Sequence, residues 1–159
     1  MRQMFSLASL ALIAAATAVP ATAQEDDAFA RMMRGESAMQ GKKLEKAIKK
    51  AEQHPLGSAE NPVRTTMPRG EHLYLSRLRC SDGKAPAFYR EGNVGPGVYG
   101  NIVDLYIVTC KDAEPGESRI YMDMYHGGFI ETRPVPGFTA VVPLEKPEEA
   151  REKPVEPRG

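Results

Sequence analysis

An export signal precedes the only two cysteines of the chain, and together these features restrict how the remaining residues can fold. Arg2 is followed by an apolar run from Met4 to Val19, and Ala21 and Ala23 occupy the small-residue positions of a cleavage site. The apolar run has about 16 residues, fewer than the roughly 20 that a membrane-spanning helix requires. We therefore expect residues 1–23 to be a signal peptide that is removed during export.

The two cysteines, Cys80 and Cys110, lie in the part of the chain that would reach an oxidising compartment. An even number of cysteines in such a compartment favours a disulfide between them. A reactive thiol pair usually has closer spacing, such as C-x-x-C, and a zinc site requires more ligands than two thiols and scattered histidines supply. We expect a periplasmic or secreted protein with one disulfide.

Length and charge are typical of one domain without nucleic acid as a partner. Without residues 1–23, the chain of 159 residues still has the length at which a single core is expected. The 21 basic and 21 acidic residues balance, and a duplex-binding protein would need a basic patch. The one candidate patch is the lysine cluster of residues 42–50, which we interpret as the solvated face of a helix.

The first segment after the signal, residues 24–56, has helical spacing. Apolar residues recur at every third or fourth position between residues 26 and 53. Gly35 and Gly41 weaken the first half, so a firmer helix is expected over residues 41–53, ended by Pro55. A lysine-rich amphipathic helix can also lie on a membrane. Because its apolar face has no tryptophan and few large residues, we expect it to pack on the core of the protein.

The next segment, residues 57–143, is predicted to be the folded α+β domain, because it is rich in β-branched, aromatic and turn residues. Residues 101–110 are apolar on both faces, which predicts a central strand. Other expected elements are strands at 84–90, 119–126 and 138–142, a hairpin loop at 111–118, and a helix at 71–80, where a strand is the alternative. Residues 144–159 alternate Glu, Lys and Pro, which predicts a disordered tail.

These elements predict an α+β fold in which an N-terminal helix packs on a small, mostly antiparallel sheet, with one disulfide. The run of glycines in residues 92–100 is not expected to bind a phosphate, because a strand follows it and no lysine does. It is typical of a long hairpin connection; the alternative is a flexible binding loop. The candidate ligand-binding residues of that loop are Tyr89, Gly95, Gly97, Tyr99 and Asp104.

Met122, Met124 and His126 alternate along a predicted strand and would share one face. Two thioethers and an imidazole suit Cu(I), so these residues are a candidate metal site. Methionines on the inner face of a strand are more often core residues, and Ile120 continues the same stripe. Core packing is therefore the expected role.

Asp104, Asp123 and His126 are the candidate acid–base residues of a small hydrolase. Paired carboxylates or an aspartate beside a histidine can transfer protons if their environments separate their pKa values. The chain has no G-x-S-x-G and no H-E-x-x-H motif. We expect structural roles instead, with Asp104 bound to an arginine or to loop amides.

Five runs resemble a group of exported bacterial proteins of unknown function: Gly57–Arg64, Tyr74–Leu75, Leu78–Cys80, Tyr99–Asp104 and Tyr121–His126. The resemblance covers residues 55–142 and implies that they form one domain. It implies no activity. We predict a binding domain rather than an enzyme, with no cofactor, with an envelope protein or a glycan as its partner, and without a membrane-embedded segment after cleavage of the signal.

Overall fold

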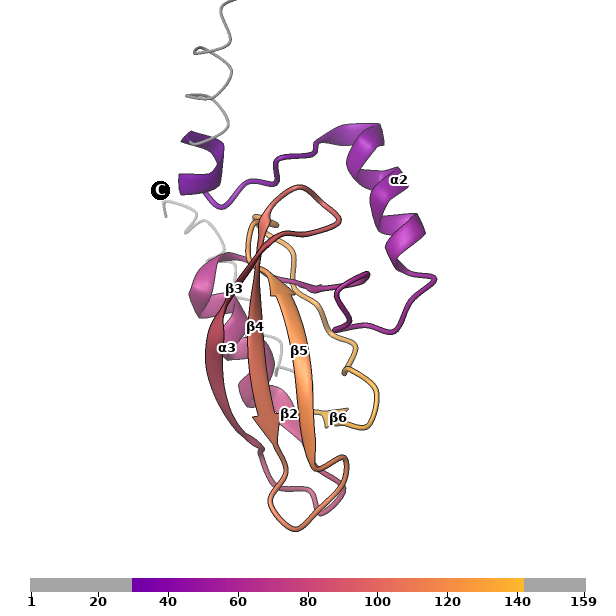
Figure 1. Cartoon of the computed structure of the whole chain (residues 1–159), viewed down its shortest axis with the longest axis vertical. Helices are drawn as coiled ribbons and strands as arrows, with labels where there is room; N and C mark the ends of the chain where they lie inside the picture. The colour runs from indigo at the N-terminus through magenta and orange to yellow at the C-terminus, as the bar shows by residue number, and fades with distance from the viewer. Residues whose placement is uncertain (1–29, 142–159) are drawn as a thin grey trace, which may run out of the picture.

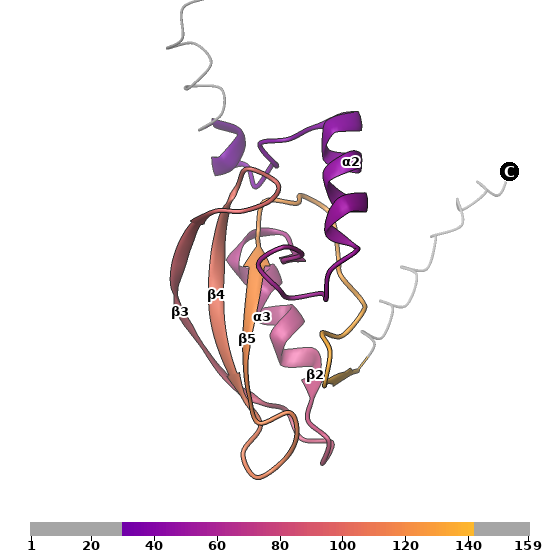
Figure 2. The same ribbon diagram turned by 45° about the vertical axis from the view of Figure 1, so that its right-hand side comes forward.

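A four-stranded sheet and one helix form the two layers of the computed structural model, which describes residues 30–141 (Figure 1). The strand order is β1-β5-β4-β3, where β1 is Val63–Arg64, β3 is Ala87–Pro96, β4 is Ile102–Thr109 and β5 is Glu117–Asp123. Among the described strands, only β1 and β5 pair in parallel. Helix α3 (Met67–Arg77) lies against one face of the sheet (Figure 2). The predicted α+β class is confirmed, while residues 1–23 and 144–159 lie outside the described residues.

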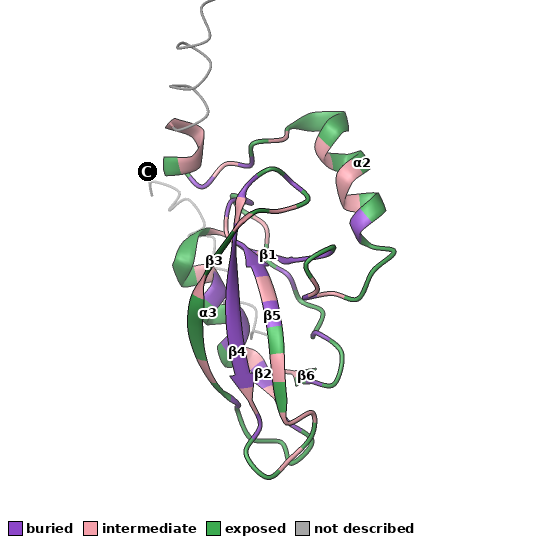
Figure 3. Ribbon diagram, viewed as in Figure 1, coloured by how far each residue is buried: buried purple, intermediate pink, exposed green. Residues whose placement is uncertain are grey.

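Strand β4 is the central strand that its apolar composition predicted. Residues 103–108 are all buried (Figure 3). Tyr106 and Val108 join Ile120 and Met122 of β5 in the core against α3. Strand β3 continues to Pro96 through two irregularities in its pairing. The glycine-rich segment therefore forms half of a strand, and the hairpin connection is shorter than predicted.

The turn between β3 and β4 depends on two glycines. The Gly97 amide donates to the Asn101 carbonyl at 2.8 Å, and the Gly100 amide donates to the Gly97 carbonyl at 2.9 Å. Gly100 has a φ of 78°, a left-handed conformation that glycine adopts without strain. A Cβ at Gly97 would collide with the side chain of Val103, which is buried. Only glycine therefore allows the backbone at residue 97 to pass this close to the side chain of Val103.

Helix α3 confirms the helical interpretation of residues 71–80 but begins and ends earlier. Pro68 occupies the first turn, where its missing N–H is not needed. The buried side chains of α3 recur at helical spacing: Glu71, Tyr74 and Leu75. The helix ends at Arg77, after which β2 (Leu78–Arg79) pairs with β6 (Thr139–Ala140) in a separate two-stranded sheet. The predicted strand at 138–142 is thus much shorter within the described residues.

Helix α2 (Gly41–Ala51) forms where predicted and ends two residues before Gln53. Its last residue, Ala51, is buried, whereas Leu44, Ala47 and Ile48 are only half-buried. The helix lies beside the end of the sheet, apart from the two layers (Figures 1 and 2). Over residues 30–141, neither α2 nor any other helix is long and apolar enough to cross a membrane.

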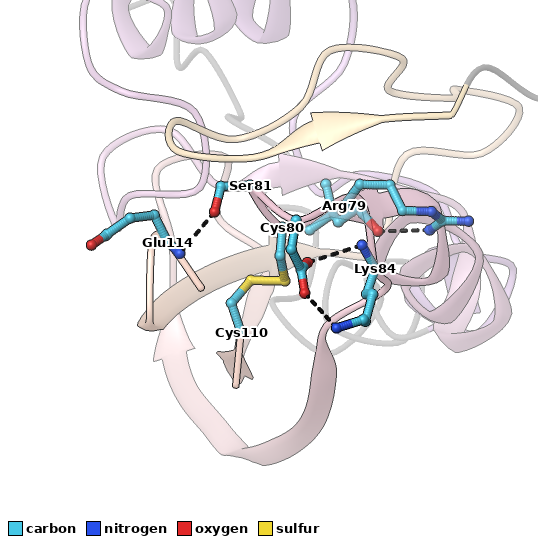
Figure 4. Close-up of a disulfide and its surroundings, with 8 residues drawn as sticks. Arg79, Cys80, Ser81, Lys84, Cys110 and Glu114 are labelled. Carbon is cyan, nitrogen blue, oxygen red and sulfur yellow. Dashed lines mark hydrogen bonds and ion pairs between the residues drawn. A yellow bond between two sulfur atoms is a disulfide. The ribbon is translucent and has the colours of Figure 1, made fainter. Parts of the chain in front are cut away.

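The predicted disulfide between Cys80 and Cys110 is present, with a Cα–Cα distance of 5.7 Å (Figure 4). It joins the chain after β2 to the end of β4. The neighbouring Ser81 amide donates to the Glu114 carbonyl, and the Glu114 amide donates to Ser81 Oγ, both at 3.0 Å. The bridge therefore fixes the loop between β4 and β5 to the end of the helical layer.

Candidate functional site

A groove runs along one side of α3, between this helix and residues 128–131, and we call it the α3 groove. Its volume is about 830 Å³ and its lining is mostly apolar. Met67, Leu73 and Ile130 stand in it with 41%, 55% and 69% of their surfaces exposed. A cavity of this size can hold a small organic ligand, and large exposed apolar side chains gathered in a concave surface indicate a binding site.

Hydrogen bonds to backbone carbonyls fix both walls of the α3 groove. The donors come from the α3 wall and the acceptors from the opposite wall: Thr66 to His126 at 2.9 Å, Tyr74 to Arg133 at 3.0 Å, and Arg77 to Glu131. The guanidinium carbon of Arg64 also lies 4.1 Å from the centroid of the Phe129 ring. These contacts hold the two walls of the groove together.

Within residues 30–141, the side-chain charges of the groove that have no ion-pair partner are positive. Arg69 and Arg77 line it together with one acid, Glu131. The Glu131 carboxylate accepts hydrogen bonds from Arg133 at 2.9 and 2.8 Å. Burial alone would raise the pKa of Glu131, but the hydrogen bonds and charge of Arg133 outweigh it and lower the pKa. Glu131 is therefore ionised and paired, which leaves the arginines to meet the charge of a ligand.

Met67, the first residue of α3, has an unusual backbone. Its φ is 58°, in the left-handed region, which costs a residue with a side chain about 1 kcal/mol. Its amide donates to the Met124 carbonyl at 2.7 Å, which holds it in place. Backbone strain of this kind is concentrated at ligand sites. The flexible thioether of Met67 also suits a surface that adapts to its ligand.

The candidate ligand-binding residues of the glycine-rich segment are separated in the structure. Tyr89 lies on β3 with 60% of its surface exposed, whereas Tyr99 is fully buried. The Tyr99 ring meets the His126 ring edge-on, with centroids 5.0 Å apart. Gly95, with a φ of 85°, lies at an irregularity of β3, and Gly97 serves the turn. The two tyrosines therefore do not flank a common surface.

The candidate copper ligands also occupy different environments. Met122 is fully buried in the core, Met124 is half-buried, and His126 is buried beside Asp123. Strand β5 ends at Asp123 instead of continuing to His126, so the alternation that predicted a shared face stops before the histidine. Over residues 30–141, no group of three or more His, Cys, Asp and Glu side chains is placed to hold a metal ion.

Asp123 is the centre of a buried polar network. Its carboxylate accepts hydrogen bonds from Asn101 Nδ2 at 3.1 and 2.9 Å and from the Tyr125 amide at 3.0 Å. His126 Nε2 lies 3.4 Å from Asp123 Oδ2. Asn101 in turn donates to Ser37 Oγ at 3.2 Å. The segment around Ser37 thus covers the aspartate, which explains its burial and indicates a structural role.

Asp104 does not join this network, although it lies on the neighbouring strand. It is paired with Met122 across the ladder, so alternation places it and Asp123 on opposite faces of the sheet. Both Asp104 carboxylate oxygens accept hydrogen bonds from Arg90, at 2.6 and 2.7 Å. The prediction that an arginine binds Asp104 is confirmed. The hydrolase grouping is only partly assembled, because Asp123 and His126 meet without Asp104.

Glu71 is a buried acid that is not among the site residues predicted from the sequence. It has no exposed surface, and its Oε2 accepts a hydrogen bond from Tyr106 at 3.0 Å, whereas its Oε1 has no hydrogen-bond partner among the described residues. Burial, followed by the charge of Asp104, raises its pKa to about 7. Glu71 therefore changes charge near neutral pH inside the core.

Comparisons with protein-family models, with curated proteins and with solved structures find no match to this chain.

The α3 groove was not predicted from the sequence. Its signals were Leu73, an apolar residue on the polar side of a helix, and Phe129 with Ile130, an apolar pair after two glycines. Neither of these features belongs to a periodic apolar pattern, so the sequence alone does not show that the two lie in one groove; the fold does.

Proposed function

We propose that this chain is an exported binding protein that holds an acyl chain with an anionic end in the α3 groove. The observation that carries the proposal is the combination of a mostly apolar groove of about 830 Å³ with arginines as its unpaired charges. The export signal and the disulfide support a location in the periplasm or outside the cell.

The lining favours an acyl chain over the glycan that composition alone left open. Sugars are held by many polar side chains, whereas Met67, Leu73 and Ile130 offer mainly hydrocarbon and a thioether. An alkyl chain that covers these side chains removes apolar surface from water, at about 25 cal/mol per Å². Arg69 or Arg77 would then meet the carboxylate or phosphate at the end of the chain.

Titration with dodecanoate below its micelle concentration, followed by amide chemical shifts, tests the proposal. We expect shifts at residues 65–77 and 128–131, and about tenfold weaker binding of dodecyltrimethylammonium, which has the same chain length and the opposite charge. Leu73→Gln should weaken dodecanoate binding about tenfold, since it removes an apolar wall. Val94→Gln is the matched control, because Val94 is 50% exposed on β3, outside the groove.

Arg69→Gln separates the charge from the apolar surface. It should reduce the preference for dodecanoate over the ammonium amphiphile, whereas Arg119→Gln, a change at an exposed arginine of β5, should not. Equal binding of both amphiphiles by the unaltered chain would contradict an anionic ligand. Absence of shifts in the groove with dodecanoate, together with shifts there on addition of an apolar peptide, would identify an envelope protein segment as the occupant and overturn the proposal.

A further inference from the structure

Helix α2 presents an unusually uniform charge. Five of its 11 residues are exposed lysines: Lys42, Lys43, Lys46, Lys49 and Lys50. Its single acid is Glu45, so the helix carries a formal charge of +4. In an α-helix these lysines fall within a sector of about 120°. No ion pair within residues 30–141 holds any of them.

The opposite side of α2 consists of apolar residues that turn toward the protein. Ala51 is buried, and Leu44, Ala47 and Ile48 are half-buried. The lysine sector is therefore directed outward, where Figure 3 shows α2 largely exposed. The other charged side chains of residues 30–141 nearly balance, so the positive charge of this part of the chain is concentrated on α2. This concentration would orient α2 toward an anionic surface.

We infer that the lysine sector of α2 docks the protein on the phosphate headgroups of an anionic lipid bilayer. Each lysine near such a surface adds a similar amount to the attraction, so the attraction of five lysines is the sum of five such contributions. A chain that is exported meets such headgroups on the membrane that it crosses. This inference does not depend on the α3 groove, which is formed by other residues.

The composition of the sector favours lipid over nucleic acid. It contains lysine only, whereas nucleic acid interfaces use arginine for bases and aromatic side chains for stacking. Lysine is a mobile point charge that suits phosphate groups without a fixed arrangement.

Flotation with lipid vesicles tests the inference on the full chain recovered after export. We expect binding to vesicles with about one quarter phosphatidylglycerol, no binding to pure phosphatidylcholine, and release at about 0.5 M salt. Lys46→Gln/Lys50→Gln should weaken binding at least about tenfold, and replacing all five lysines by glutamine should abolish it. Lys84→Gln/Lys111→Gln, an equal change of charge outside α2, should leave binding within about twofold.

Three outcomes would overturn the inference. Equal binding to both kinds of vesicle would mean that apolar contacts hold the protein on the membrane. Unchanged binding of the five-glutamine chain, with an intact far-ultraviolet spectrum, would exclude α2 as the docking surface. Tighter binding to a short DNA duplex than to the anionic vesicles, lost in the same variant, would identify nucleic acid as the polyanion.

Discussion

Replacing Glu71 by glutamine should make the stability of this protein less dependent on pH. The side chain is fully buried against Tyr106, and its pKa is raised from 4.5 to about 7, mainly by burial. Below pH 4.5, Glu71 is neutral in both the folded and the unfolded chain and has no effect on the pH dependence. Between pH 4.5 and about 7, the unfolded chain ionises while the folded chain stays protonated, so stability falls as the pH rises.

The size of this effect follows from the shift. Each unit of difference between the folded and unfolded pKa corresponds to about 1.36 kcal/mol. The free energy of unfolding therefore falls by about 3 kcal/mol as the pH rises from below 4.5 to above about 8, where the fall is complete. For a small domain this is a large share of the free energy of unfolding. Glutamine is the nearest neutral replacement, because it keeps the shape of the side chain and an oxygen that can accept the hydrogen bond from Tyr106.

Urea unfolding of the unaltered chain and of Glu71→Gln, measured from about pH 4 to about pH 9, provides the test. The free energy of unfolding of Glu71→Gln minus that of the unaltered chain should rise by about 3 kcal/mol across the range. Glu117→Gln, at an exposed position of β5, should show a flat difference. A flat difference for Glu71→Gln as well would refute the reasoning, because it would mean that Glu71 ionises in the core as easily as in the unfolded chain.

Three further predictions concern the fold and the groove. Replacing Cys80 and Cys110 by alanine should lower the free energy of unfolding by about 3 kcal/mol, measured in urea without reductant, whereas an unchanged midpoint would exclude a stabilising bridge. Gly97→Ala should destabilise the fold by about 1–3 kcal/mol, because its Cβ meets the buried Val103, and a neutral result would show that the β3–β4 turn moves freely. Met67→Gly should be more stable than Met67→Ala by about 1 kcal/mol in thermal unfolding, since only glycine relieves the left-handed backbone; the reverse order would exclude strain there.

The elements that the sequence predicted well are those whose environment is uniform along the chain. Strand β4 is apolar on both faces, and its residues 103–108 are buried whichever face of the sheet they occupy. Helix α2 has a regular apolar face and a proline four residues after its end. In both cases the local pattern and the tertiary environment agree, so the pattern alone was sufficient.

The boundaries of α3 and β5 were predicted less well because polar residues occupy buried positions. Glu71 takes a place in the core-facing stripe of α3, which interrupts the apolar period that would have identified the helix. Strand β5 ends at Asp123 because the Asp123 carboxylate accepts hydrogen bonds from the side chain of Asn101 and from the backbone amide of Tyr125, two residues further along the chain. Strand β1 has only two residues, so it has no period to detect, and its partner β5 is far away in the sequence.

Occupancy of the α3 groove and protonation of Glu71 should act independently, although both involve α3. Glu71 faces Tyr106 of the sheet and does not line the groove. A ligand at about 100 times its dissociation constant should therefore add about 2.7 kcal/mol to the free energy of unfolding at both about pH 6 and about pH 8. Urea unfolding with and without dodecanoate, at concentrations matched to the affinity at each pH, measures this increment. An increment that differs between the two pH values, but not in Glu71→Gln, would show that the helix transmits the charge of Glu71 to the groove and that its two sides are coupled.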